Sequence, residues 1–293
     1  MTSVYTPVTR EPLAEPVRRI QMSELLVAPM AIAYLALVFA PLGMLVIQSS
    51  GDGHSLSLAT YSRIFEDAYT LSILLSTVRI GVITTSVVAI ISYPIALAFL
   101  FATARQRTLL IFMVILPLLT GTVVRTFAWI VILGRDGPLN DLLRAFAIVQ
   151  EPVQVLFTDL GVIIAIVQIE LPLMILPLVT SLIRIDPNLL LASRSLGAGR
   201  WRMFRKLIVP LTLPGLVAGC TLVFSSSVSA FITQAVVGGG KRVYMPLLIY
   251  QQATDLHNLP AASALAIVLL LTVCAAIVLL GIVGRSRWGW HHA

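Results

Sequence analysis

The chain has 293 residues, of which 58% are hydrophobic and 11% are charged. Soluble domains carry about 25% charged residues, so this deficit indicates that much of the fold is solvated by lipid. The net charge is +7, but the sequence contains no polar domain. A nucleic-acid-binding module, which needs a basic face on such a domain, is therefore excluded. Cys220 and Cys274 lie within apolar runs and indicate packing residues rather than a disulfide framework.

Residues 1–24 are polar and rich in proline and arginine. They lack a short apolar core followed by a small-residue cleavage site, so we expect a loosely ordered cytoplasmic tail rather than a cleaved signal peptide. After this tail, six apolar segments reach the length of about 20 residues that a membrane span needs. They run approximately from Leu25 to Gln48, Leu74 to Ala102, Leu109 to Leu133, Leu160 to Ile183, Leu211 to Thr233 and Ala261 to Val283.

This pattern predicts an all-α polytopic membrane protein with six transmembrane helices. Residues 25–284 would form one transmembrane domain, with the loop at about 184–210 between spans four and five, and residues 285–293 would form a C-terminal tail. Polar or proline positions interrupt the third and fourth segments, so their ends are the least sharply marked. Gly215 and Gly219 form a small-xxx-small pair of the kind that allows close helix packing.

Positive charge is distributed unevenly between the two sets of connecting segments. One set contains thirteen basic residues: Arg10, Arg18, Arg19, Arg105, Arg107, Arg184, Arg194, Arg200, Arg202, Arg205, Lys206, Arg285 and Arg287. The opposite set contains five: Arg63, Arg135, Arg144, Lys241 and Arg242. Because basic residues accumulate on the cytoplasmic side, we expect both termini and the 184–210 loop to be cytoplasmic.

The 184–210 loop has the pattern of two short helices joined by glycine. Asp186 can cap a helix that Pro187 begins, and Gly197 and Gly199 would end it. One face of this helix would hold Leu189, Ala192, Ser193 and Leu196. A basic amphipathic stretch follows, whose apolar side would hold Trp201, Phe204 and Leu207 or Ile208.

Two interpretations of this loop stay open on physical grounds. Its charges fit an interfacial segment held by anionic lipid headgroups. Its apolar face comes before the basic segment instead of alternating with it, which favours a rigid knob that docks on a cytoplasmic partner.

The loop resembles a family motif. Ala192, Gly197 and Pro210 match the Glu-Ala-Ala loop of ABC-importer permeases at the spacing of that motif, whereas Leu191 stands in place of its Glu. Further stretches, over roughly residues 60–284, resemble the spermidine/putrescine permease branch. They are Glu66-Asp67, Thr77-Val78-Arg79, Tyr93-Pro94-Ile95-Ala96, Leu116-Pro117, Val124–Trp129, Gly137-Pro138-Leu139-Asn140, Leu171–Leu178, Gly238–Lys241 and Leu248–Gln252.

The resemblance implies a multi-pass inner-membrane transport subunit for a polyamine or a related small organic solute. Its implied partners are membrane lipid, a second and different permease chain, a cytoplasmic ATPase dimer and an external solute-binding protein. The implied ATPase-coupling residues are Leu189, Ala192, Ser193, Arg194, Leu196, Gly197, Ala198, Arg200 and Pro210.

No catalytic, cofactor or metal site is predicted. The Gly-x-x-x-x-Gly-Lys signature of ATP-binding proteins is missing, because Ala235 stands where the first Gly would precede Gly240-Lys241. Hydrolysis would therefore belong to the partner ATPase. His54 and His257 are isolated, and His291-His292 is a terminal pair. A structural or scaffold membrane protein that docks a cytoplasmic partner without transport is the alternative function.

Charged residues inside a span usually face the bundle interior or water. Glu170 lies in the middle of the fourth span; it could line a pathway for a cationic solute or form a structural bridge with Arg125 or Arg79. The serines of the fifth span, Ser225, Ser226, Ser227 and Ser229, could line the cavity or permit close packing. The candidate pathway residues are Arg125, Trp129, Glu170, Ser225 and Ser229.

Overall fold

A computed structural model describes residues 22–49 and 59–286 of the chain, and these residues are helical with short connections and contain no strand. The chain divides into two compact units, residues 1–44 and 45–293. The first unit holds most of helix α1 (Met22–Ser49), which contains the first predicted span. The predicted tail falls outside the described residues up to residue 21. Helix α1 includes residues 22–24, the last three residues of the expected tail.

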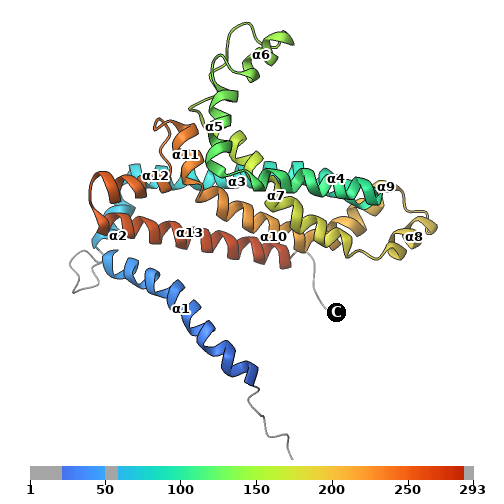
Figure 1. Cartoon of the computed structure of the whole chain (residues 1–293), viewed down its shortest axis with the longest axis horizontal. Coiled ribbons are helices and arrows are strands. Elements are labelled where there is room, and N and C mark those ends of the chain that lie inside the picture. The colour runs from blue at the N-terminus through green and yellow to red at the C-terminus, as the bar shows by residue number, and fades with distance from the viewer. Residues whose placement is uncertain (1–21, 50–58, 287–293) are drawn as a thin grey trace, which may run out of the picture. The chain divides into compact units, whose positions relative to one another are not determined.

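The second unit is built on four long helices that run side by side (Figure 1). They are α3 (Ala68–Phe101), α7 (Asp159–Ile183), α10 (Val209–Val228) and α13 (Leu259–Ser286). Helices α3, α7 and α10 all pack on one another, and α13 packs on α10. The fold class predicted from the sequence is confirmed: within the described residues, five helices are long and apolar enough to cross a membrane, and a bent pair of helices, taken as one span, makes a sixth.

The third predicted span is this bent pair rather than one straight helix. Helix α4 (Ala104–Ile115) continues into a 3-10 turn, η1 (Leu116–Leu119), and α5 (Thr122–Leu133) then leaves at an angle of 95°. The 3-10 turn contains Pro117, whose carbonyl accepts the Thr120 amide. Hydropathy detects the apolar length of this segment but not the change of direction that a proline turn and Gly121 allow.

The fifth predicted span differs from the structure at both ends. Toward the loop, α9 (Arg200–Met203) and a π-helical turn, η2 (Phe204–Ile208), run into α10 as one helical stretch. The expected second short helix is therefore the beginning of the span. A π turn at this place is consistent with Pro210, which cannot donate a backbone hydrogen bond and crowds the carbonyl four residues earlier. At the other end, Thr233 belongs to a separate helix, α11 (Phe231–Gly238).

Close packing of α7 on α10 depends on the two glycines of the small-xxx-small pair. A Cβ atom on Gly215 would lie 2.5 Å from the Pro177 carbonyl oxygen, and one on Gly219 would lie 2.5 Å from the sulfur of Met174. Both glycines are buried in this contact. The packing role expected for them is confirmed.

Two pairs of short helices lie at the two ends of the bundle. Helix α8 (Pro187–Ser195) lies with α9 at one end, and α2 (Ala59–Glu66) lies with α12 (Met245–Tyr250) at the other (Figure 1). A π-helical turn, η3 (Gln251–Asp255), follows α12, and α6 (Pro138–Ala145) follows α5. The 184–210 loop, predicted to be cytoplasmic, thus lies at the opposite end of the bundle from α2 and α12, which belong to segments predicted to be external (Figure 1). Which end faces the cytoplasm stays a prediction. The boundaries of the two tails also stay predictions.

Candidate functional site

Glu170 lies in the middle of α7 and is 2% exposed. One of its carboxylate oxygens, Oε1, accepts a hydrogen bond of 2.7 Å from the hydroxyl of Ser226 on α10. The other oxygen, Oε2, is buried and has no hydrogen-bond partner among the described residues. A buried carboxylate is normally paired or fully hydrogen-bonded, so Oε2 is a polar atom that the described residues leave without a donor.

A cavity of about 380 Å³ lies next to this carboxylate. Its wall is formed by residues of α5, α7, α10 and α11 and of the connection between the last two: Thr122, Ile166, Ile169, Glu170, Ser226, Ser229, Ala230, Phe231, Ile232 and Thr233. The wall includes the point where the chain breaks between α10 and α11. Interrupted helices at membrane depth line many transporter binding sites, because the interruption leaves polar groups facing a cavity.

The five candidate pathway residues have different surroundings. Glu170 and Ser229 line the cavity. Trp129 donates a hydrogen bond of 3.3 Å from its indole nitrogen to the side chain of Gln168, which joins α5 to α7. Ser225 is half-buried and is absent from the cavity wall.

Arg125 does not form the expected bridge. Its Nε and Nη1 atoms are buried without a hydrogen-bond partner, although its charge is near enough to act on Glu170. Arg79 is exposed. Within residues 22–49 and 59–286, the one ion pair joins Arg242 and Asp159, so neither arginine is paired with Glu170.

Ser226 is the site residue that the sequence did not single out from its serine neighbours. A signal for it exists in the sequence, because Ser226 follows Gly219 by seven residues and Gly215 by eleven. These spacings place all three on one helix face. The glycines define the face of α10 that packs on α7, and Ser226 continues that face.

The helix at the other candidate site, the 184–210 loop, begins and ends as its sequence predicts. The carboxylate of Asp186 caps α8 by accepting the Asn188 amide at 2.8 Å, and Pro187 is its first residue. At its end, the Gly197 amide donates to the Arg194 carbonyl and the Ala198 amide to the Ser193 carbonyl. This pair of bonds is a Schellman motif, and it needs the left-handed conformation that Gly197 adopts at φ 73°.

The apolar face of α8 is exposed. Leu189 and Ala192 lie on the surface and Leu196 is 87% exposed. Ser193 is half-buried and donates to the Leu190 carbonyl, and Leu190 packs on the core. These three exposed side chains form an apolar surface of the kind that marks interaction sites.

The stretch after Gly199 has a different inward face from the one predicted. Met203 and Ile208 are buried, Phe204 and Leu207 are half-buried, and Trp201 is 72% exposed. The indole of Trp201 stacks on the ring of Phe204 at 5.5 Å between centroids. The π turn rotates the helix between Trp201 and the residues after it, which periodicity alone does not reveal.

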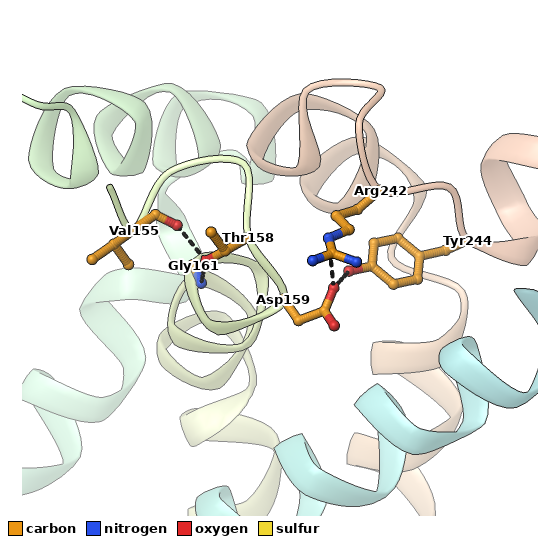
Figure 2. Close-up of polar contacts among 6 residues, drawn as sticks. All are labelled: Val155, Thr158, Asp159, Gly161, Arg242 and Tyr244. Carbon is orange, nitrogen blue, oxygen red and sulfur yellow. Dashed lines mark hydrogen bonds and ion pairs between the residues drawn. The ribbon is translucent and has the colours of Figure 1, made fainter. Parts of the chain in front are cut away.

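A polar cluster lies at the opposite end of α7, which begins at Asp159 (Figure 2). The hydroxyl of Tyr244 donates to Asp159 at 2.9 Å, and the Nε atom of Arg242 lies 3.4 Å from the same carboxylate oxygen. Burial of Tyr244, together with its bond to the carboxylate, raises the pKa of the phenol. The Thr158 hydroxyl accepts the Gly161 amide and donates to the Val155 carbonyl, which fixes the start of α7. The cluster therefore ties this helix to the segment before α12.

The part of the chain that the structure describes contains no group of three or more His, Cys, Asp or Glu side chains that could hold a metal ion. His54 and the His291-His292 pair lie outside the described residues.

Comparison with known proteins gives one family. Residues 94–287 match the family model described as "Binding-protein-dependent transport system inner membrane component". The spermidine/putrescine transport system permease protein PotB of Escherichia coli (strain K12) is 32% identical over 213 residues, which cover 73% of this chain and 77% of that protein. PotB of Haemophilus influenzae is 33% identical over 212 residues, which cover 72% and 74%.

The fold agrees with this assignment. A chain of a bacterial alginate ABC transporter, solved in complex with an alginate pentasaccharide-bound periplasmic protein, superposes with a TM-score of 0.72 at 17% identity. The likeness covers 91% of this chain and 94% of that chain. The family match, the identity to the two PotB proteins and the helical fold lead to one conclusion. The chain belongs to the family of binding-protein-dependent transport system inner membrane components and is a multi-pass permease subunit of the ABC-importer type.

Proposed function

We propose that the chain forms half of the translocation pathway of an ATP-driven importer for spermidine, putrescine or a related cationic solute. The observation that carries the proposal is the unpartnered Oε2 atom of Glu170 beside the cavity. A protonated amine would donate to this oxygen while the Ser226 hydroxyl keeps its bond to Oε1. Charge-assisted bonds of this kind are about twice as strong as neutral ones.

The rest of the cavity wall also suits an aliphatic polyamine. Ile166 and Ile169 offer apolar surface to methylene groups, and the ring of Phe231 can attract an ammonium through its face. The two PotB relatives are named as spermidine/putrescine permeases, which supports the same class of solute.

The proposal assigns coupling to α8 and the turn after it. The exposed Leu189, Ala192 and Leu196 would enter a groove of a cytoplasmic ATPase dimer, and the Schellman turn at Gly197 would keep them rigid. Ser193, Arg194, Ala198 and Arg200 would support this contact, and Pro210 would begin the span that receives the motion. A second, different permease would complete the pathway, and an external solute-binding protein would deliver the solute.

Glu170→Gln tests the proposed pathway in proteoliposomes that contain the chain with its partner permease, ATPase and binding protein. Replacing the carboxylate by an amide of the same shape removes the charge that holds the amine. We expect the rate of ATP-dependent spermidine uptake to fall by about 10- to 100-fold, equivalent to the roughly 1.5–3 kcal/mol of a hydrogen bond to a charged group.

Glu151→Gln is the matched control, because Glu151 is exposed in the loop before α7 and outside the cavity. Uptake by the Glu151→Gln complex should equal that of the unmodified complex. Equal uptake by the Glu170→Gln complex would remove Glu170 from the pathway.

A further inference from the structure

A separate cavity of about 350 Å³ lies beside α8, at the bundle end that carries the 184–210 loop. Its apolar wall is formed by Leu97 and Phe101 at the end of α3 and by Met203, Phe204 and Ile208 at the start of the fifth span. Arg194 and Arg200 complete the wall. The cavity thus has an apolar floor supplied by two membrane-spanning helices and a cationic edge supplied by the loop.

The two arginines have no counter-charge in the wall, which contains no acidic residue. In the described part of the chain, neither guanidinium takes part in an ion pair, since the pair formed there joins Arg242 and Asp159. A third arginine, Arg107, donates hydrogen bonds to the carbonyls of Phe99 and Leu100 at the end of α3, so these carbonyls already have a partner. Arg194 and Arg200 are therefore available to an external anion.

We propose that this cavity binds an anionic phospholipid. Two guanidinium groups suit a phosphate, which they can hold through paired hydrogen bonds, and basic pockets between span ends recognise anionic headgroups. The five apolar side chains below them would contact an acyl chain. Phe101 is 61% exposed, so the apolar wall is accessible from outside the bundle on the side of this ring.

The chemistry of the wall favours a lipid over an acidic segment of a protein partner. Leu97, Phe101 and Ile208 belong to helices that are long and apolar enough to cross a membrane, whereas Leu189 and Leu196, on the exposed face of α8, are not in the wall. A lipid seated here would contact α3, α8 and α9 together. It would thereby hold the coupling segment against the bundle, a regulatory consequence that rests on the proposed function.

Native mass spectrometry of the purified full chain in detergent tests lipid binding without any ATPase. Phosphatidylglycerol and phosphatidylcholine with identical acyl chains are the probes. We expect one retained phosphatidylglycerol and an affinity for it that falls about tenfold or more in the Arg194→Gln/Arg200→Gln variant. Leu97→Trp, which fills the cavity and keeps every charge, should also reduce retention. Inorganic phosphate should not displace the lipid.

Arg202→Gln/Arg205→Gln is the matched control, because it removes the same charge from exposed positions of the same segment outside the cavity. This control should bind phosphatidylglycerol like the unmodified chain. Three results would overturn the proposal: equal retention of the two lipids, an equal loss in both double variants, or lipid binding that is unchanged in the Arg194→Gln/Arg200→Gln variant. None of these results would alter the uptake test at Glu170.

Discussion

At the scale of single residues, the Glu170–Ser226 pair shows how packing positions chemistry. The glycines at 215 and 219 bring α10 so close to α7 that a serine hydroxyl on the same face reaches a glutamate in the neighbouring span. One carboxylate oxygen thereby accepts a hydrogen bond, and the other has no hydrogen-bond partner among the described residues. The serine both orients the carboxylate and lowers the cost of burying it.

Ser226→Ala should therefore reduce stability as well as transport. The substitution removes the one hydrogen bond that the Glu170 carboxylate accepts from the described residues. A buried carboxylate is then left without a donor. We expect a loss of about 1–3 kcal/mol in unfolding free energy, measured as a lower Tm in detergent. Ser225→Ala is the matched control, because Ser225 lies next in sequence but outside the cavity wall. If both variants melted at the same temperature, the bond from Ser226 to Glu170 would not contribute to the stability of the fold.

The pH dependence of stability gives a second test at this scale. The carboxylate of Asp67 caps α3 by accepting the Tyr69 and Thr70 amides and the Thr70 hydroxyl. These bonds, led by that of the hydroxyl, hold the pKa of Asp67 below its usual value. Because the folded-state pKa is depressed, the stabilisation is present above the unfolded pKa of about 4 and is lost as the pH falls through the folded pKa.

A pH series of melting curves for the chain and its Asp67→Asn variant measures this contribution. The difference in Tm between the two should be constant near neutral pH and should shrink in acid. A difference that stays constant down to the lowest pH at which the chain remains folded would show that ionised Asp67 adds nothing to the cap.

At the scale of elements, α8 presents an exposed apolar face because its ends are fixed. Asp186 and Pro187 determine where it begins, and the left-handed Gly197 determines where it ends. Each of these signals is local, so the sequence predicted α8 well. The stretch after it was predicted less well, because the π turn before Pro210 joins it to the span, and that turn has no local signature of comparable strength.

Gly197→Ala tests whether this turn matters for docking. The left-handed backbone of Gly197 costs a residue with a Cβ about 1–2 kcal/mol, and a Cβ there would meet no neighbour, so strain is the only cost. We expect a lower Tm and weaker co-purification of the ATPase with the chain. Gly199→Ala is the matched control, since its Cβ is equally free and its φ of −62° is ordinary. Equal behaviour of the two variants would exclude a role for the left-handed turn.

At the scale of the whole molecule, hydropathy predicted that six apolar segments exist, but not how they are arranged. The 95° bend between α4 and α5 and the break between α10 and α11 place Thr122 and Phe231 in the cavity wall, and neither is visible in apolar length. Contacts between distant segments, such as Tyr244 with Asp159, also depend on the assembled fold. Glu170 is therefore recognisable in the sequence as a candidate site residue, because a charge within a span is conspicuous. Ser226 is not, because it is one serine among several.

The close packing of α7 on α10 makes Gly215 a test of the assembled bundle. Gly215→Ala forces the Pro177 carbonyl and the side chain of Ser181 to move, and overpacking of this kind costs about 1–3 kcal/mol. We expect a clearly lower Tm in detergent. Gly281→Ala in α13 is the matched control, because its Cβ would have no neighbour within 4 Å and alanine favours helix over glycine. An unchanged Tm for Gly215→Ala would contradict the packing described for the two helices.

We expect the chain to work in an importer that moves a cationic solute at the expense of ATP. The most direct measurement is the accumulation of radiolabelled spermidine in proteoliposomes that contain the complete complex, with ATP or a non-hydrolysable analogue on the ATPase side. We expect accumulation with ATP and none with the analogue. Putrescine should compete with spermidine, whereas an uncharged solute of the same length should not. Accumulation that is independent of hydrolysis, or that an uncharged solute suppresses equally, would contradict this expectation.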